Sequence, residues 1–285
     1  MTDTQGATGP VATPARGVED LDADTQLALT GERTVPGIPA ENYWFRRHEI
    51  AYTAITEACR SRRVLEAGSG EGYGAAMLAD AGAEVVCVDY DTSAVEHTRK
   101  RYPNLEIHQG NLISLPLADA SVDIVVNFQV IEHLWDQVRF IEECVRVLRP
   151  GGTLFISTPN RITFSPGRDT PLNPFHTREL NAAELTELII AGGLVPQRMA
   201  GVFHGPRLRE LDEKWGGSLI DAQIERALAG QEWPAELVAD VAGVSVTDFV
   251  ILESARTTDS PSTGYAHIDR SLDLFATAIR PGLPA

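Results

Sequence analysis

The chain has 285 residues, 43% of them apolar, which is enough to form the core of one large domain. Its formal net charge is −16, which argues against a nucleic-acid or anionic-membrane partner, because both are bound by clustered Lys and Arg. Three scattered cysteines fit neither a disulfide framework nor a zinc site, so a cytoplasmic location is expected. The sequence shows no signal-peptide pattern at its start and no apolar run long enough to span a bilayer.

The first 60 residues are predicted to form a flexible segment followed by a lid helix. Residues 1–24 are rich in Thr, Gly, Pro, Ala and Asp and lack hydrophobic periodicity, so they are expected to be mobile or weakly docked. A Gly/Pro-rich loop follows at 30–39. Residues 41–59 then place apolar side chains on one face, which predicts a helix.

Apolar runs and amphipathic stretches alternate along residues 61–255, as is typical of a mostly parallel sheet with helices on both faces. Strands are expected at 64–66, 84–89, 105–109, 122–128, 153–157, 194–202 and 245–253. Helices are expected at 73–81, 94–101, 135–148 and 182–191, with an amphipathic insertion at about 203–243. The predicted fold is therefore a Rossmann-like α/β domain with a seven-stranded sheet.

Two stretches are expected to lack regular structure. The loop at 158–177 contains four prolines and is expected to cover the ligand, because long loops at the carboxyl edge of such sheets often do. Residues 256–285 are interpreted as a C-terminal tail that is irregular apart from a short helix at 272–279.

A glycine-rich turn lies within residues 63–74 (R-V-L-E-A-G-S-G-E-G-Y-G), between a short apolar strand and a helix. This order indicates the first ligand-binding corner of a doubly wound sheet, and Asp89, 23 residues after Glu66, is spaced for a ribose contact. A dinucleotide corner would have a third glycine where this chain has Tyr73, and Glu66 and Glu71 would repel a diphosphate. The corner therefore favours a cationic cofactor without phosphate.

Five motifs in this order resemble those of the class I S-adenosylmethionine (SAM)-dependent methyltransferases. They are E-A-G-S-G-E-G (66–72), V-V-C-V-D (85–89), Q-G-N-L (109–112), V-D-I-V-V-N-F-Q-V-I-E-H-L (122–134) and V-L-R-P-G-G-T-L (147–154). The resemblance implies SAM as the cofactor, with Asp89 on the ribose, Tyr90 beside the adenine, and Asn111 where the adenine amino group is often met by Asp. The residues implied to bind SAM are Glu66, Gly68, Gly70, Gly72, Asp89, Tyr90, Asn111, Leu112 and Asn127.

The predicted catalytic residues follow the strand at 122–128. Methyl transfer to a hydroxyl requires removal of its proton, so a base or a metal ion should lie near the transferred methyl group. Glu132 and His133 could form a general base pair or ligate Mg²⁺, and a structural role at a helix start is the alternative for both. His176, in N-P-F-H-T-R-E-L, is a second catalytic candidate or packs in the lid, and Arg178 could fix a substrate oxygen.

Further stretches resemble bacterial methyltransferases of saccharide biosynthesis. They are T-G-E-R-T-V-P-G (30–37), E-N-Y-W-F-R-R-H-E-I-A-Y (41–52), T-P-N-R (158–161) and N-P-F-H (173–176). The chain is similar to the actinobacterial sugar O-methyltransferases of methylmannose polysaccharide synthesis, which implies a short methylated mannoside as acceptor, at its 1-OH. Tyr43, Arg46 and Arg178 would contact it, and Trp135 and Phe164 are among the aromatic side chains available to sugar faces.

Two other functions stay open. One is an O-methyltransferase that acts on a quinone or a lipid precursor, and the other is a non-catalytic SAM-binding protein. Nucleic-acid methylation is disfavoured by the charge and by N-F-Q-V (127–130), where amino-methylating enzymes have an N-P-P-aromatic turn. The expected partner is thus a small oligosaccharide, without nucleic acid or membrane, and a homodimer is left open.

Overall fold

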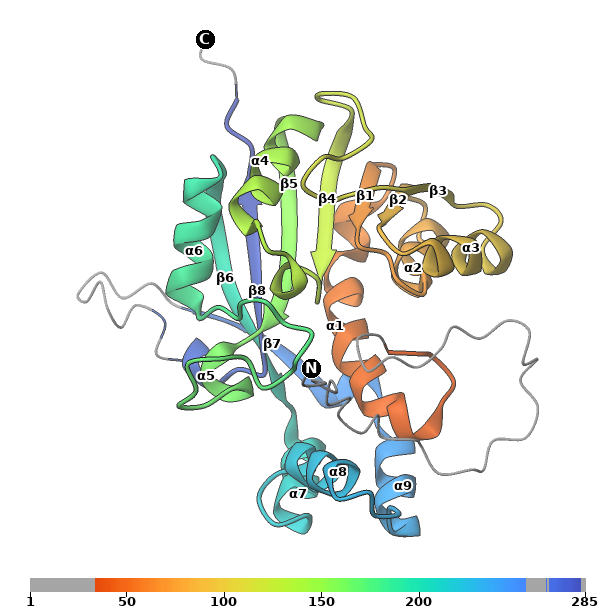
Figure 1. Cartoon of the computed structure of the whole chain (residues 1–285), viewed down its shortest axis with the longest axis vertical. Coiled ribbons are helices and arrows are strands. Elements are labelled where there is room, and N and C mark those ends of the chain that lie inside the picture. The colour runs from red at the N-terminus through yellow and green to blue at the C-terminus, as the bar shows by residue number, and fades with distance from the viewer. Residues whose placement is uncertain (1–33, 255–264, 266, 283–285) are drawn as a thin grey trace, which may run out of the picture.

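The computed structural model describes residues 34–254, 265 and 267–282, so the predicted mobile segment at 1–24 lies outside the described residues. Its centre is one eight-stranded sheet in the order β3-β2-β1-β4-β5-β8-β6-β7 (Figure 1). The strands are β1 (Arg63–Ala67), β2 (Glu84–Asp89), β3 (Glu106–Gln109), β4 (Val122–Phe128), β5 (Leu148–Pro159), β6 (Val195–His204), β7 (Phe249–Glu253) and β8 (Asp273–Ile279). The first five strands pair in parallel, and β8 runs antiparallel to β5 and β6.

Helices cover both faces of this sheet. The α-helices of the described residues are α1 (Asn42–Cys59), α2 (Tyr73–Asp80), α3 (Thr92–Arg101), α4 (Gln137–Val147), α5 (Arg161–Phe164), α6 (Ala182–Ala191), α7 (Pro206–Lys214), α8 (Leu219–Leu228) and α9 (Ala235–Ala242). One buried cluster joins the sheet to α4 and α6, and a second joins it to α1, α2 and α3. The predicted Rossmann-like α/β class is therefore confirmed. Within the described residues, no helix combines the length and apolarity needed to cross a membrane.

The sheet has eight strands where seven were predicted, because residues 273–279 form a strand and not a short helix. β8 is inserted between β5 and β6, and most of its side chains are buried. A strand covered on both faces has a continuous apolar sequence that lacks the alternation of a half-exposed strand. Its two alanines, good helix formers, add to the ambiguity.

The N-terminal helix α1 is anchored to the sheet and to a small helical lobe. Arg47 forms a buried bidentate ion pair with Asp273 of β8, with N–O distances of 2.6 and 2.7 Å. The lobe comprises α7, α8 and α9, which lie together below the sheet in Figure 1 and correspond to the predicted insertion. Tyr43 belongs to the apolar cluster of this lobe, so α1 packs against both the sheet and the lobe.

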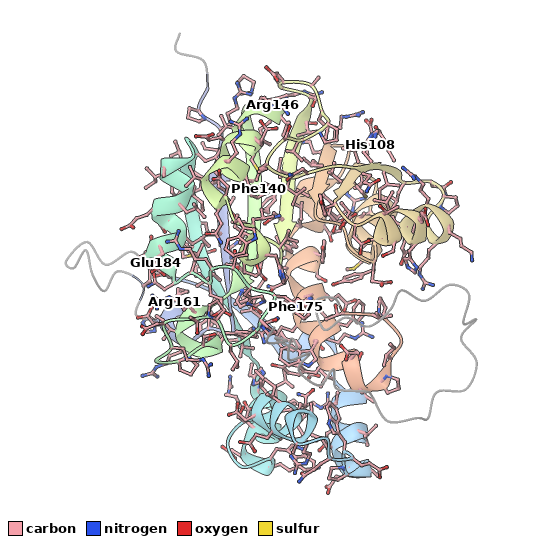
Figure 2. All side chains as sticks on the ribbon, in the orientation of Figure 1. His108, Phe140, Arg146, Arg161, Phe175 and Glu184 are labelled. Atoms are coloured by element: carbon pink, nitrogen blue, oxygen red, sulfur yellow. The ribbon has the colours of Figure 1, made fainter. Side chains whose placement is uncertain are left out.

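The long loop after β5 is tied down at its ends. Asn160 caps α5 and its side-chain amide donates to the backbone oxygens of Ile268 and Ser271. Arg161 pairs with Glu184 at the start of α6, with an N–O distance of 3.1 Å, and Figure 2 shows the two side chains together. The loop is thereby held at the carboxyl end of the sheet, where Phe175 lies between the sheet and the lobe (Figure 2).

Candidate active site

Two neighbouring parallel strands bring the glycine turn next to the turn that follows β4. β1 pairs with β4 so that Glu66 lies opposite Val126. Beyond the strands the two turns touch, since a Cβ on Gly68 would lie 2.7 Å from Val130. Ligands of open α/β sheets bind at the carboxyl ends of strands in such a position.

The glycine turn has a backbone conformation that other residues rarely adopt. Gly68, Gly70 and Gly72 have φ angles of 86°, 48° and 76°, in the left-handed region. A Cβ on Gly72 would also lie 2.8 Å from Thr98 of α3. The turn therefore packs closely against Val130 and Thr98, and at these glycines only backbone atoms are available to a ligand.

Several buried polar atoms beside this turn lack a hydrogen-bond partner among the described residues. They are Oε2 of Glu66, Oγ of Ser69 and Oδ1 of Asn127. The other polar atoms of two of these side chains are fixed: the Tyr52 hydroxyl donates to Glu66 Oε1 at 2.6 Å, and Asn127 Nδ2 donates to the Ala67 carbonyl at 2.8 Å. Buried polar atoms are normally paired, so these oxygens mark a place for a ligand with donor groups.

Burial raises the pKa of the Glu66 carboxyl to about 8. The hydrogen bonds from Tyr52 and from the Ala75 backbone lower this pKa, and the charge of Asp89 raises it. A cationic ligand next to the carboxyl would lower its pKa and favour the charged form, so the site is suited to such a ligand.

The end of β2 carries the predicted ribose and adenine contacts. The two oxygens of Asp89 accept hydrogen bonds from the backbone N–H groups of Gly70 and Asp91, at 2.8 and 2.9 Å. Each carboxylate oxygen keeps a second lone pair, which can accept from a ribose hydroxyl. Tyr90 follows and is 75% exposed, so its ring is free to lie against a base.

The turn after β3 places Asn111 and Leu112 differently from each other. Asn111 Oδ1 accepts from the backbone N–H of Ile113 at 3.1 Å, which leaves one lone pair of this oxygen for a ligand. The Leu112 side chain is buried in the core cluster, so only its backbone is available to the cofactor.

The three predicted catalytic side chains do come together. Glu132 and His133 lie on the 3₁₀ turn Ile131–His133, and His176 lies on the long loop. Atoms of Glu132, His133 and His176 that could bind a metal all lie within 4.8 Å of one another. Glu132 is buried and accepts a hydrogen bond from the Thr158 hydroxyl at 2.9 Å. Burial raises the pKa of Glu132, while His133 and His176 lower it.

The hydrogen bonds of His133 define which ring nitrogen carries the proton. Its Nδ1 lies 3.1 Å from the carbonyl oxygen of Phe175. A carbonyl can only accept, so Nδ1 holds the hydrogen and the neutral ring has its lone pair on Nε2. No described residue hydrogen-bonds to this Nε2. His133 therefore offers an unoccupied basic nitrogen at the turn.

Both ring nitrogens of His176 are engaged. Nδ1 lies 2.7 Å from the Glu179 carboxylate, and Nε2 lies 3.1 Å from the side-chain amide of Asn173. The ring stacks on Phe164 at 5.4 Å and meets the His133 ring edge-on at 4.9 Å. His176 is thus fixed beside His133, and both of its ring nitrogens are already hydrogen-bonded.

The predicted acceptor contacts have different positions. Tyr43 is fully buried and its hydroxyl lies 2.6 Å from His204 Nε2, so this side chain is held in packing and is not exposed to an acceptor. Arg46 pairs with Glu49 at 2.7 Å. Arg178 is exposed beside the catalytic turn, where its backbone N–H donates to the Glu132 carbonyl, and its guanidinium has no partner among the described residues.

Comparison with known proteins identifies the family. A family model described as a methyltransferase domain matches residues 65–156. The chain is 60% identical over 255 residues to the probable S-adenosylmethionine-dependent methyltransferase Rv3030 of Mycobacterium tuberculosis, covering 90% of each chain. A probable SAM-dependent methyltransferase of Mycolicibacterium smegmatis is 59% identical and covers 90% of this chain and 96% of its own. The chain belongs to the SAM-dependent methyltransferase family.

More distant matches concern the cofactor domain and the fold. Demethylmenaquinone methyltransferase of Renibacterium salmoninarum is 31% identical over 111 residues, which cover 39% of this chain and 47% of that protein. The structure of YcgJ from Bacillus subtilis superposes with a TM-score of 0.53 at 19% identity, covering 82% and 99% of the two chains. The [4+2]-cyclase SpnF gives 0.52, also at 19% identity, covering 82% and 81%. These two likenesses show the fold alone.

The described residues of this methyltransferase fit SAM. The cofactor carries an amino group and a positive sulfur, and the partnerless oxygens of Glu66, Ser69 and Asn127 can accept from such a ligand. Asp89 would hold the ribose, and the glycine turn would line the methionine part.

Sequence reasoning missed three residues of the methyltransferase site. Tyr52 reaches Glu66 from α1, Thr158 reaches Glu132 from the end of β5, and Glu179 holds His176. The H-x-x-E spacing of His176 and Glu179 was a visible signal. The other two contacts arise only when separate elements pack together, so no local pattern indicates them.

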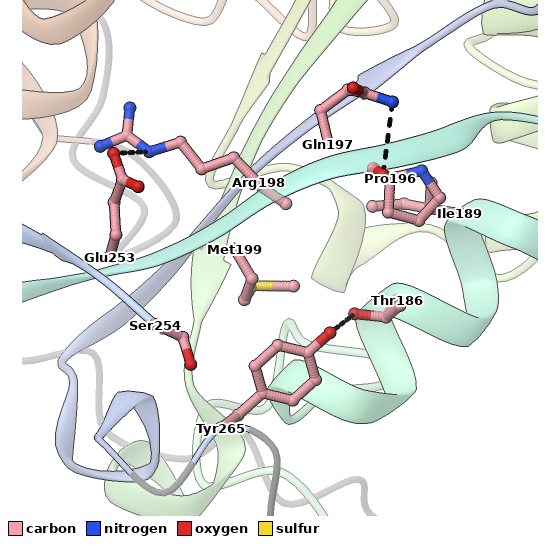
Figure 3. A pocket seen from close by; sticks show the side chains of 10 residues that line it. Thr186, Ile189, Pro196, Gln197, Arg198, Met199, Glu253, Ser254 and Tyr265 are labelled. Carbon is pink, nitrogen blue, oxygen red and sulfur yellow. Dashed lines mark hydrogen bonds and ion pairs between the residues drawn. The ribbon is translucent and has the colours of Figure 1, made fainter. Parts of the chain in front are cut away.

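A separate hollow of about 250 Å³ lies between α6 and β6 of the methyltransferase, away from these strand ends. Figure 3 shows that the Tyr265 hydroxyl bonds to Thr186 across it, and that Arg198 pairs with Glu253 at its rim. It contains none of the predicted site residues.

Proposed function

We propose that this methyltransferase acts on a saccharide hydroxyl, and that the acceptor is a short methylated mannoside methylated at its 1-OH. The observation that carries the hydroxyl part is the Nε2 atom of His133, which has no partner among the described residues. His133 lies on the 3₁₀ turn that starts after Val130, the residue that contacts the glycine turn. A hydroxyl must lose its proton on methylation, whereas many other acceptors need no base.

The reaction divides between the cofactor and the protein. The bound cofactor supplies a methyl group on a positively charged sulfur, which keeps the electrons of the broken bond. His133 Nε2 takes the hydroxyl proton while the acceptor oxygen bonds to the methyl carbon. The Phe175 carbonyl fixes the ring through Nδ1, and Glu132 and the His176–Glu179 pair lie beside it.

The rim of the catalytic turn supports a sugar as acceptor. Trp135, two residues after His133, is 92% exposed, and Phe175, whose carbonyl oxygen contacts His133 Nδ1, is 44% exposed. The flat apolar face of an exposed aromatic ring can pack against the apolar face of a pyranose, while polar groups nearby bind its hydroxyls. Arg178 adds hydrogen-bond donors next to them, so the rim is not uniformly apolar as a quinone pocket would be.

Mg²⁺ is a second way to activate the same hydroxyl. Glu132, His133 and His176 would be its ligands, but one carboxylate and two imidazoles match Mg²⁺ less well than an all-oxygen site. We therefore propose that His133, and not a metal ion, activates the hydroxyl by removing its proton. Activity should then survive treatment with a chelator, whereas a loss that Mg²⁺ restores would make these side chains metal ligands.

A methyl-transfer screen tests the acceptor. Mannosides, methylated mannobioses, glucosides and quinols are incubated with methyl-labelled SAM, and the labelled products are identified by mass spectrometry. Transfer to a mannoside alone supports the proposal. Transfer to a quinol would favour a reaction like that named for the menaquinone relatives, and no transfer to any acceptor would favour a SAM-binding protein without activity.

A further inference from the structure

Tyr52 connects the N-terminal helix α1 to the cofactor corner. Its ring is 6% exposed and packs edge-on against Phe128 of β4 at 4.9 Å and against Tyr73 at 5.8 Å. A Cβ on Gly74 would overlap this ring, so the glycine in α2 provides the space that Tyr52 occupies. The position of the ring is therefore fixed by elements on several sides.

The Tyr52 hydroxyl orients the carboxyl of Glu66. It donates to Oε1 at 2.6 Å, and the second oxygen, Oε2, is buried without a partner among the described residues. With one oxygen held, the carboxyl cannot rotate freely, and Oε2 keeps one direction. That oxygen is then preorganised for a ligand donor.

No described cation faces this carboxyl. The titratable groups in electrostatic contact with Glu66 are Tyr52 and Cys59 of α1, Tyr73 of α2, and Cys87 and Asp89 of β2. Tyr, Cys and Asp side chains are neutral when protonated and negative when deprotonated, so none of these groups can neutralise the Glu66 carboxylate. A cationic group of a ligand would supply it.

We propose that Tyr52 is a positioning residue for the cofactor, which holds Glu66 so that Oε2 accepts from a cationic group of SAM. The helix α1 thereby becomes part of the cofactor site. The proposal depends on SAM binding, which the family shows, and is independent of the acceptor proposed above. A failed acceptor screen would leave it intact.

The hydroxyl also affects the pH at which Glu66 becomes charged. Its hydrogen bond lowers the pKa of Glu66, while burial raises that pKa to about 8. Removal of the hydroxyl should raise the pKa further, so more of the protein would hold Glu66 neutral at a given pH. SAM affinity should rise with pH in both proteins, and the midpoint of this rise should lie at higher pH in the protein without the hydroxyl.

The test is the substitution Tyr52→Phe, which keeps the ring and removes only the hydroxyl. The dissociation constant of SAM is measured by calorimetry from pH 6 to 9, together with KM for SAM and kcat. At pH 7.5 we expect the dissociation constant and the KM for SAM each to rise about tenfold, while kcat at saturating SAM stays within about twofold. The pH midpoint of SAM binding should move to a higher value.

Tyr73→Phe is the matched control. The Tyr73 hydroxyl lies in the same aromatic cluster but hydrogen-bonds to Thr34 and not to Glu66, so SAM affinity should change by less than about twofold. In a Glu66→Gln background, Tyr52→Phe should have little further effect, because the two residues act as a unit. Unchanged affinity and pH midpoint in Tyr52→Phe, or an equal effect of Tyr73→Phe, would overturn the proposal.

A second measurement covers a Tyr52→Phe protein that does not fold. Hydrogen–deuterium exchange of the unmodified protein should slow in the α1 segment around Tyr52 when SAM is added, since SAM would stabilise the Tyr52–Glu66 contact. Exchange in α1 that is the same with and without SAM would contradict the proposal.

Discussion

His133 is the side chain on which the proposed proton transfer rests. Three backbone and side-chain contacts of its turn hold it in place: Phe175 accepts from its Nδ1, and the backbone N–H and hydroxyl of Thr177 both bond to the Glu132 carbonyl. These hydrogen bonds tie the turn to the long loop, and Nε2 lies on the side of the ring opposite the atom that the Phe175 carbonyl fixes.

Substitution of His133 by Ala should lower kcat by roughly 10²–10⁴-fold, the usual contribution of a general base. SAM affinity should not change, because His133 is not among the residues proposed to bind the cofactor. Initial rates with saturating SAM and acceptor, together with calorimetric SAM binding, measure the two effects separately.

His108→Ala is the control for this substitution. His108 lies on β3, where its ring bonds to Glu106 at 2.8 Å, so its loss should leave kcat unchanged. A kcat for His133→Ala within about threefold of the unmodified enzyme would remove His133 from the mechanism.

The single residues that could be predicted are those whose conformation or position depends on a local motif. Gly68, Gly70 and Gly72 have the left-handed angles that a glycine turn requires, and Asp89 lies at the expected strand end. Tyr43 could not be placed, because its burial results from packing between α1 and the helical lobe. Tyr52 was missed because its contact with Glu66 joins a helix to a strand.

Among the elements, α1 and β8 depend on each other through the Arg47–Asp273 pair. Both side chains are almost fully buried, and Arg47 also donates to the Leu272 carbonyl at 2.9 Å. β8 pairs with β5, the strand that leads into the long loop. The Arg47–Asp273 ion pair therefore links the N-terminal helix to the centre of the sheet.

Removal of one partner should destabilise the protein strongly. Asp273→Asn leaves the Arg47 guanidinium buried without its counter-ion, and we expect a loss of about 3–5 kcal/mol in the free energy of unfolding. Urea denaturation followed by circular dichroism measures this. The double variant Arg47→Met, Asp273→Leu should recover most of the loss, because replacement of both charges avoids the unpaired ion; equal losses in both variants would refute this account.

The elements that were predicted correctly have strong periodic signals. α1, α4 and α6 have clear apolar faces and lie within a few residues of their expected bounds. β8 lacks such a signal, and its place in the sheet depends on pairing with β5 and β6, which are distant in sequence. Sequence reasoning could therefore give the α/β class but not the eighth strand.

The whole molecule responds to pH through buried carboxyls such as Glu66. In the unfolded chain this group ionises near its ordinary pKa of 4.5, and in the folded, cofactor-free protein near 8. Between these values the unfolded state loses the proton first, so this group makes the fold less stable as pH rises.

Glu66→Gln should reduce this dependence, because the amide does not titrate. Between pH 5 and 8 the unmodified cofactor-free protein should lose up to about 1.4 kcal/mol of unfolding free energy per pH unit more than the variant does. Urea titrations at several pH values compare the two slopes, and parallel slopes would show that Glu66 ionises normally in the fold.

We propose that the chemistry of the whole protein combines a SAM site at the ends of β1 and β2 with a base on the turn after β4. The measurement that tests this most directly is NMR of the product formed from ¹³C-methyl-labelled SAM and a methylated mannobiose. The proposed function predicts one new labelled methyl ether, at the anomeric oxygen, that is absent with His133→Ala. A label on carbon or nitrogen of another acceptor, or no transfer to any saccharide while a quinol is methylated, would contradict it.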